Sequence, residues 1–240
     1  MSENDLRIQL IPLGGLGEIG KNMLAIRCQD TIIVIDAGLM FPEEELLGID
    51  IVIPDITYLI ENQEKVKAIF LTHGHEDHVG ALPYVLKELN VPVYGSRLTL
   101  GLVEAKLKDN NLEKVDYHVV KPRDMVKIDN MDIEFFRVSH SIPDSMGIAI
   151  HTPIGIILHT GDIKLDQTPV DGELVDFRKM AELGEKGVLV MLSDSTNADR
   201  SGYTMSEKVV GNTFVELFAK CEGRIIATTF ASNVHRIQQV

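Results

Sequence analysis

The sequence predicts a layered α/β fold, and two observations support that prediction. Apolar stretches typical of buried strands recur along the chain and end at polar or glycine-containing turns. Other segments, at 81–89 and 206–221, have the apolar spacing of helices. Strands outnumber helices in the early part of the chain and the two mix later, a pattern that is typical of helices packed on sheets.

The elements follow one another in a definite order. Strands are expected at 7–12, 23–27, 31–36, 66–72, 91–95, 132–138, 148–151, 155–160 and 187–192. The helix at 81–89 follows the fourth of these strands, and Ser206 is the expected N-cap of the helix over 206–221. The final segment, 232–240, has the pattern of an amphipathic helix that has only begun. We therefore expect the chain to be a fragment of a longer protein.

Composition limits the classes of protein to consider. The 240 residues can bury one substantial core, and 45% hydrophobic with 25% charged residues is ordinary for a globular protein. No apolar run is long enough to span a bilayer, and the N-terminus lacks the pattern of a signal peptide. Cys28 and Cys221 match neither a disulfide framework nor a CxxC metal pair. The sequence thus predicts a cytoplasmic protein without a membrane segment.

The charge balance weighs mildly against a polyanionic partner. The formal net charge is −13, whereas basic patches supply most sequence-independent affinity for nucleic acids. Bound divalent metals would add positive charge where carboxylates cluster, so the acidity does not exclude nucleic acid as a substrate.

A cluster of histidines predicts a metal site. His73, His75 and His78, with Asp77 between the last two, lie within six residues directly after an apolar strand. Imidazole and carboxylate are suitable ligands for zinc or manganese. A solvated polar turn would not be expected to gather three of the chain's eight histidines.

Two further ligands are expected at the ends of later strands. His140 follows the strand over 132–138, and Asp162 follows the strand over 155–160. His140 would complete a set with His73 and His75, and Asp162 could bridge two ions because a carboxylate has two oxygens. The remaining histidines of strand-like runs, His118, His151 and His159, are interpreted as structural.

The complete set of motifs resembles a known family. His-x-His-x-Asp-His, a distal histidine and an aspartate after Thr-Gly resemble the motif series of the metallo-β-lactamase superfamily. More narrowly, residues 72–84 resemble the β-CASP nucleases, and among them the bacterial ribonuclease J family. Further similar segments are 12–22, 36–42, 193–197 and 230–236, so the resemblance covers essentially the whole chain.

The resemblance implies a fold and a division into domains. The expected architecture is the α/β metallo-β-lactamase αββα sandwich, with the start of an inserted β-CASP domain. Residues 1–203 would form the first metallo-β-lactamase segment, and 204–240 would begin the β-CASP domain. A full-length relative would carry one more metal-ligating histidine, a phosphate-binding segment and a C-terminal domain, so we expect weak or no activity from this fragment alone.

The implied activity is hydrolysis of RNA phosphodiester bonds, as a 5′–3′ exonuclease, an endonuclease or both, in the processing and decay of RNA. Two metal ions, Zn²⁺ with Mn²⁺ or Mg²⁺ as alternatives, would hold a hydroxide nucleophile. The expected ligands are His73, His75 and His140 on one ion, Asp77 and His78 on the other, and Asp162 between them.

Two aspartates outside the ligand set are candidate catalytic residues beside Asp77. Asp36 would orient a ligand imidazole or the nucleophilic water, with a plain turn aspartate as the alternative. By resemblance, Asp194 would assist protonation of the leaving group, with an Asx-turn as the alternative.

Further contacts are expected at residues whose sequence signals are less specific than the histidine cluster. The resemblance implies that Ser232, Asn233 and Val234 bind the RNA backbone, and His235 either faces RNA or covers a surface. The acidic turn at 43–50 could bind Ca²⁺ through Asp50 and Gly48, although such loops are usually only solvated. By family analogy the partners are RNA, further copies of the chain (a dimer or tetramer), a paralogue, and RNA-degradation machinery.

Three other functions share features with this sequence. Gly15, Gly17 and Gly20, with Asp36 at a suitable distance, fit a dinucleotide-binding fingerprint, but the following segment is too short and strand-like for the required helix. A lactamase-fold small-molecule hydrolase, such as a glyoxalase II-like thioesterase, would use the same metal ligands. A non-catalytic RNA-scaffolding role is the third alternative.

Overall fold

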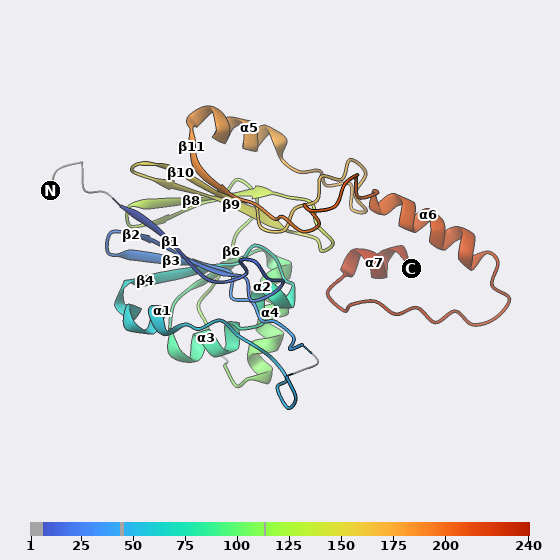
Figure 1. Cartoon of the computed structure of the whole chain (residues 1–240), viewed down its shortest axis with the longest axis horizontal. Coiled ribbons are helices and arrows are strands. Elements are labelled where there is room, and N and C mark those ends of the chain that lie inside the picture. Colours follow the sequence, from blue (N-terminus) through green and yellow to red (C-terminus); the bar gives the residue numbers. More distant parts are fainter. Residues whose placement is uncertain (1–6, 44–45, 113) are drawn as a thin grey trace.

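The computed structural model describes residues 7–43, 46–112 and 114–240. Two β-sheets face each other and carry helices on their outer faces, so the four layers form an αββα sandwich (Figure 1). The predicted α/β fold class is confirmed.

The first sheet has the order β1-β2-β3-β4-β5-β6. Its first three strands are antiparallel, and β3 to β6 are parallel. Parallel neighbours need crossover connections, which the helices α1, α3 and α4 supply on the outer face. The strands are β1 (Ile8–Gly14), β2 (Met23–Cys28), β3 (Thr31–Ile35), β4 (Val66–Phe70), β5 (Val93–Gly95) and β6 (Tyr117–Val119). The helices of this half are α1 (Thr57–Glu61), η2 (Gln63–Lys65), α2 (Glu76–Val79), α3 (Leu82–Glu88) and α4 (Arg97–Asp109).

The second sheet has the order β11-β10-β9-β8-β7. Its strands are antiparallel except for the parallel pair β10 and β11, which the helix α5 (Phe177–Lys186) connects. The strands are β7 (Met125–Ile128), β8 (Met131–Arg137), β9 (Met146–Thr152), β10 (Gly155–His159) and β11 (Val188–Leu192).

The apolar core explains why the strands appear in the sequence as continuous apolar runs. In β3, Ile32 packs toward the outer helices and Ile33 toward the second sheet, so both faces of the strand are buried. Phe70 of the first sheet and Phe135 of the second meet between the sheets, with ring centroids 6.0 Å apart. A third cluster joins the second sheet to Leu183 of α5. The buried strands hold their polar carboxyl-terminal loops at fixed positions.

The sequence prediction omits the short helices α1 and η2, the longer helices α4 and α5, and the strands β6 and β7. α4 contains a glycine, Gly101, which lowers helix propensity, and α5 has a lysine, Lys179, at a buried position where the apolar pattern would need a hydrophobic residue. β6 and β7 are only three and four residues long, too short for a periodic signal.

The last part of the chain lies beside the sandwich (Figure 1). The predicted N-cap is confirmed, because Ser206 accepts a hydrogen bond from the backbone of Lys208 at the start of α6 (Glu207–Phe218). No residue of α6 is buried, and α7 (Val234–Gln239) follows. In the described ranges no helix combines the length and apolarity needed to cross a membrane.

Lys179 of α5 makes a buried ion pair that we expect to stabilise the second sheet. Its Nζ lies 2.7 Å from Glu134 on β8, whose other oxygen is 2.9 Å from His151. Burial would raise the pKa of Glu134, but the hydrogen bonds from Lys179 and His151 outweigh it and lower that pKa.

Replacing Lys179 with methionine should therefore lower the free energy of unfolding by about 2–4 kcal/mol, because Glu134 keeps only one partner. A carboxyl group with a lowered pKa stabilises the fold above its ordinary pKa, and this contribution disappears as the pH falls through the folded-state value. The difference in the free energy of unfolding between the unaltered protein and Lys179→Met should therefore become smaller in acid. Urea denaturation at neutral and acidic pH measures it, with Lys186→Met at the exposed end of the helix as control. Equal losses for both variants would contradict the prediction.

Candidate metal centre

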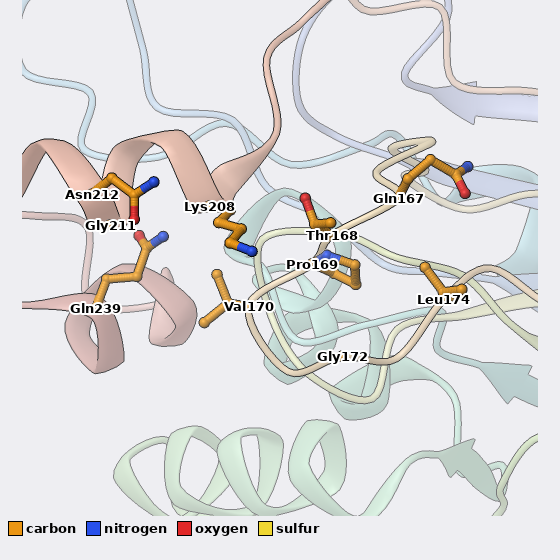
Figure 2. Close-up of a pocket in the computed structure, with 10 residues that line it drawn as sticks. All are labelled: Gln167, Thr168, Pro169, Val170, Gly172, Leu174, Lys208, Gly211, Asn212 and Gln239. Atoms are coloured by element: carbon orange, nitrogen blue, oxygen red, sulfur yellow. The ribbon is translucent and has the colours of Figure 1, made fainter.

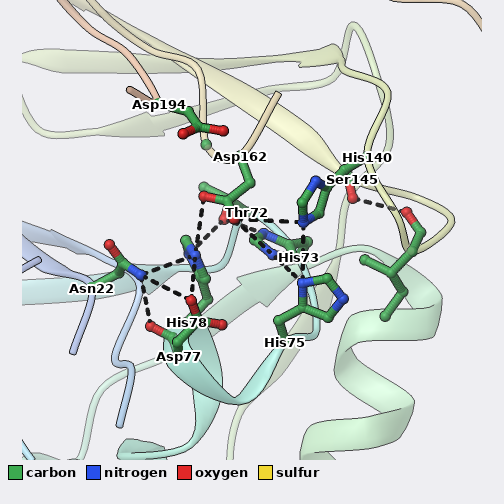
Figure 3. A network of polar contacts seen from close by, with 12 residues as sticks. Asn22, Thr72, His73, His75, Asp77, His78, His140, Ser145, Asp162 and Asp194 are labelled. Carbon is green, nitrogen blue, oxygen red and sulfur yellow. Dashed lines mark hydrogen bonds and ion pairs between the residues drawn. The ribbon is translucent and has the colours of Figure 1, made fainter. Parts of the chain in front are cut away.

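The predicted ligands meet where the strands of both sheets end (Figure 3). His73 and His75 lie in the loop after β4, and Asp77 and His78 lie in the single-turn helix α2. The second sheet supplies His140 after β8 and Asp162 after β10. Residues far apart in sequence thus converge because all these strands point their carboxyl ends at one edge of the sandwich.

The first group of ligands surrounds His75. Its Nδ1 lies 3.0 Å from Nε2 of His73 and 3.1 Å from Nε2 of His140. Asp162 Oδ2 lies 3.5 Å from the His140 nitrogen and 4.0 Å from that of His73. All four atoms lie within 4.8 Å of one another, a spacing that one ion could satisfy.

The second group lies on the other side of Asp162. Its Oδ1 is 3.2 Å from Nε2 of His78, which is in turn 3.7 Å from Oδ2 of Asp77. Asp162 therefore directs one carboxylate oxygen toward each group. This is the arrangement expected of a carboxylate that bridges two ions.

Asp36 lies behind the ligands at the end of β3 and is buried. Its Oδ2 accepts a hydrogen bond from Nδ1 of His78 at 2.7 Å, which leaves the Nε2 lone pair of a neutral His78 directed at the second group. Thr72 donates to Asp36 from its amide to Oδ1 and from its hydroxyl to Oδ2, both at 2.8 Å.

Through Thr72, Asp36 also acts on the first group. Because the Thr72 hydroxyl donates to Asp36, it accepts from Nδ1 of His73, which lies 3.0 Å away. The Nε2 of His73 is then free to bind a metal. One buried carboxylate thus contacts a histidine of each group, His78 directly and His73 through Thr72.

Burial and charge shift the pKa values of these groups in opposite directions. Burial lowers the pKa of His73 well below its ordinary value, lowers that of His75, and lowers that of His140 to about 4. Burial would raise the pKa of Asp162, but contact with His78 outweighs it and lowers the pKa to about 2. The first group is therefore neutral imidazoles around a carboxylate, the form in which these side chains bind metals.

His78 and Asp77 of the second group have shifts of their own. Burial alone would lower the pKa of His78, but the charge of Asp36 and the contact with Asp162 raise it well above its ordinary value. The pKa of the Asp77 carboxyl is raised by burial.

A close backbone contact holds α2 in place. The carbonyls of Glu76, Asp77 and His78 accept hydrogen bonds from the amides of Leu39, Asn22 and Ala37, respectively. A Cβ on Gly38 would overlap the carbonyl group of Asp77, so only glycine fits between these segments.

Replacing Gly38 with alanine should displace α2 and with it Asp77 and His78. We expect a loss of about 1–3 kcal/mol in the free energy of unfolding, as for an overpacked core, together with weaker binding of the second metal. Gly101→Ala is the control, because its Cβ meets open space in α4 and should stabilise the protein by about 0.5–1 kcal/mol. Chemical denaturation and metal titration measure both effects. Unchanged metal binding by Gly38→Ala would contradict the prediction.

Asn22 is a residue of the site that the sequence analysis missed. Its Nδ2 lies 3.1 Å from the carbonyl of Asp77 and 3.1 Å from Nε2 of His78. The only sequence signal was its place at the end of the glycine-rich segment. That segment continues directly into β2, antiparallel to β1, so the helix required of a dinucleotide-binding site is absent from these described residues.

The other candidate residues lie further from the ligands. Asp194 accepts hydrogen bonds from the amides of Thr196 at 2.8 Å and Ile163 at 3.4 Å, so it forms the Asx-turn and lies beside the Asp162 segment. Asn233 caps α7 by accepting from the amide of Arg236, and the backbone of Ser232 lies near the His75 imidazole.

Asp50 and Gly48 are exposed, and in the described part of their loop no group of three metal-binding side chains is found. Glu44 and Glu45 of this acidic turn lie outside the described residues.

The histidines interpreted as structural have separate contacts. His118 stacks on Tyr94, and His151 binds Glu134. His159 accepts a hydrogen bond from the amide of Gly161 at 3.0 Å, close behind the metal ligands.

A family model and curated relatives match this chain over most of its length. The family model described as the metallo-beta-lactamase superfamily matches residues 16–200. The chain is 51% identical to a ribonuclease J 2 of Staphylococcus aureus and 49% identical to one of Staphylococcus epidermidis, over 234 residues in each case. The match covers 97% of the chain and 42% of each relative, so the chain spans less than half the length of these curated relatives.

Solved structures share the fold at low sequence identity. A protein of unknown function from Enterococcus faecalis aligns with a TM-score of 0.70 at 19% identity, over 98% of this chain and 62% of that one. Unliganded yeast PDE1 aligns with a TM-score of 0.56 at 12% identity, over 97% and 92% of the two chains. These similarities support the fold alone.

Proposed function

The chain belongs to the metallo-β-lactamase superfamily, and from this premise we propose that it is the metal-binding part of a metal-dependent ribonuclease. The observation that carries the proposal is the position of Asp162, whose two oxygens face two separate sets of ligands. Such an arrangement suits a dinuclear hydrolase better than a single structural ion, which is usually enclosed by four ligands.

The donor atoms fit divalent transition metals. His73, His75, His140 and Asp162 would hold the first ion, and Asp77, His78 and Asp162 the second. We propose zinc, because imidazole nitrogen suits zinc better than the harder magnesium ion, with manganese as an alternative. Two ions would polarise a phosphodiester and make water nucleophilic at neutral pH.

The chain's own residues prepare this site for the reaction. Asp36 fixes the tautomer of His78 directly and that of His73 through Thr72. Asp77 is exposed enough at the pocket to contact substrate as well as metal. Asp194, which lines the same pocket, is the proposed donor or relay for the proton that the leaving oxygen needs.

RNA is the proposed substrate because the relatives at about 50% identity are named as ribonucleases. We propose contacts to the RNA backbone at Ser232, Asn233 and Val234, at the start of α7. The division at residues 203 and 204 is also proposed, and it is supported by the family match ending at residue 200. A cytoplasmic location, assembly with further copies or a paralogue, and association with RNA-degradation machinery are proposed for the whole protein. Exonuclease and endonuclease roles in the maturation and decay of RNA are likewise proposed for the whole protein.

The test combines metal analysis with a choice of substrates. The chain and the full-length product of its gene are assayed with 5′-labelled RNA, with a phosphodiester chromogen and with a glutathione thioester, after loading with zinc or manganese. The proposal predicts two bound metal ions per chain and RNA cleavage by the full-length protein. Turnover of the thioester without RNA cleavage would favour the glyoxalase II-like alternative. Tight RNA binding without cleavage of RNA or the chromogen would favour a scaffolding role.

A further inference from the structure

Helix α7 contacts a loop that carries a metal ligand. His235 is buried, with only 7% of its surface exposed, although α7 lies beside the sandwich (Figure 1). Its Nδ1 lies 3.2 Å from the carbonyl oxygen of His140, and its Nε2 lies 3.3 Å from Oδ2 of Asp171. Because a carbonyl oxygen can only accept a hydrogen bond, Nδ1 of His235 carries a proton and donates this hydrogen bond to the carbonyl of His140.

The peptide that His235 contacts belongs to the loop of the ligand His140, which a second segment also contacts. The preceding carbonyl, that of Ser139, accepts from the amide of Lys164 at 2.7 Å. Lys164 lies two residues after Asp162. The two successive carbonyls of the His140 loop are therefore held by the segment of a neighbouring ligand and by α7.

A chain of ion pairs connects these two supports. Glu207, the first residue of α6, binds Nζ of Lys164 at 2.9 Å and Nη2 of Arg236 at 2.9 Å. Its carbonyl accepts from Nε2 of Gln239 at 2.7 Å. Arg236 is the neighbour of His235, so the contacts form a ring that runs from Asp162 through α6 and α7 back to His140.

A cavity separates another part of α6 and α7 from the sandwich. Figure 2 shows residues of α6 and α7 facing the 167–174 loop across a cavity of about 550 Å³. Several polar side chains make the close contacts, and His235 is the buried residue of α7. The backbone of Ser232, which precedes α7, lies near the His75 imidazole.

We propose that His235 is a positioning residue for the first metal site: by holding the His140 carbonyl, it fixes the direction of the His140 imidazole. The segment expected to contact RNA thereby also supports the metal centre. This role rests on the metal centre proposed above.

Three variants at one position test the role. His235→Asn places an amide donor near the position of Nδ1, His235→Gln places one near Nε2, and His235→Ala removes both. The first equivalent of metal should enter the four-ligand group, where it is followed by the visible absorption of Co²⁺ and by zinc competition. We expect the alanine and glutamine variants to bind it about 10–100-fold more weakly, as is typical of residues that orient metal ligands. The asparagine variant should bind within about threefold of the unaltered chain.

Ile237→Ala is the matched control, because Ile237 is exposed on the same helix. Circular dichroism identifies a variant that fails to fold. If the alanine variant fails to fold, the comparison of the asparagine and glutamine variants still tests the role of His235. Asparagine binding as weakly as glutamine, or all variants binding normally, would overturn the role of His235 alone. If the unaltered chain binds no Co²⁺ or zinc, the metal centre itself is wrong.

Discussion

Replacing Asp162 with alanine is expected to weaken the binding of both metal ions, an effect that no single histidine substitution should produce. One oxygen of Asp162 faces His73 and His140, and the other faces His78. Removing the carboxylate leaves three imidazoles in the first group and only two ligands in the second. Loss of a residue that only hydrogen-bonds a metal ligand costs about 10–100-fold in metal affinity, so we expect the loss of a ligand to cost more than about 100-fold for each ion. Elemental analysis and calorimetric titration measure the stoichiometry and affinity.

Two comparisons make this prediction specific. His75→Ala should weaken the first ion and leave the second, because His75 belongs to the first group alone. Asp166→Ala is the matched control: Asp166 lies in the same segment and is buried, but its carboxylate accepts hydrogen bonds from the amides of Thr168 and Glu207 instead. If Asp162→Ala loses one ion and keeps the other at normal affinity, Asp162 does not bridge them.

The sequence was sufficient to predict which candidate ligands come together, because their chemistry and their position in the strand pattern agree. Imidazole and carboxylate side chains follow the predicted strands at 66–72, 132–138 and 155–160. The carboxyl ends of these strands meet at one edge of the structure. The strands β8 and β10 point the same way, because each is antiparallel to β9, so their loops leave the sheet at the same edge. The sequence predicts that the ligands follow buried strands, and the topology of the sheets supplies the common direction of these strands.

The support of the ligands could not be predicted in the same way. Asn22 and Asp77 are 55 residues apart, and His235 and His140 are 95 apart, with no pattern that links either pair. His235 was expected to face RNA or cover a surface, and its burial depends on how α7 contacts the His140 loop. Such contacts are decided by tertiary packing, which local periodicity does not encode.

Asp36 was predicted from the sequence as a candidate residue, but its contacts were known only from the structure. Its substitution by asparagine is the second change with a large expected effect. Asparagine has nearly the same shape and tolerates the left-handed backbone of this position, where φ is 60°. The amide of Thr72 needs an acceptor, so the asparagine oxygen must take the place of Oδ1. Its NH₂ group then occupies the place of Oδ2 and faces both His78 and the Thr72 hydroxyl.

The consequence is a reversal of the hydrogen bonds to both groups of ligands. An amide that donates to Nδ1 of His78 forces the imidazole proton onto Nε2, the atom directed at the second ion. The Thr72 hydroxyl, now an acceptor from the amide, donates to Nδ1 of His73 and moves that proton to Nε2 as well. Both ligand nitrogens would have to lose a proton or break a buried hydrogen bond before they could bind metal.

We therefore expect Asp36→Asn to weaken metal binding more than Asp36→Ala does, although asparagine is the closer replacement in size. Alanine leaves each imidazole free to adopt the binding tautomer and should cost about 10–100-fold in affinity, whereas a fixed wrong tautomer of a catalytic histidine can cost about 10⁴-fold in rate. Metal titration gives the order of the two variants, and long-range ¹H–¹⁵N spectra of the imidazoles identify the protonated nitrogen directly. The reverse order would mean that Asp36 acts by its charge or by packing. The order predicted here would mean that it acts by determining which nitrogen of each histidine carries the proton.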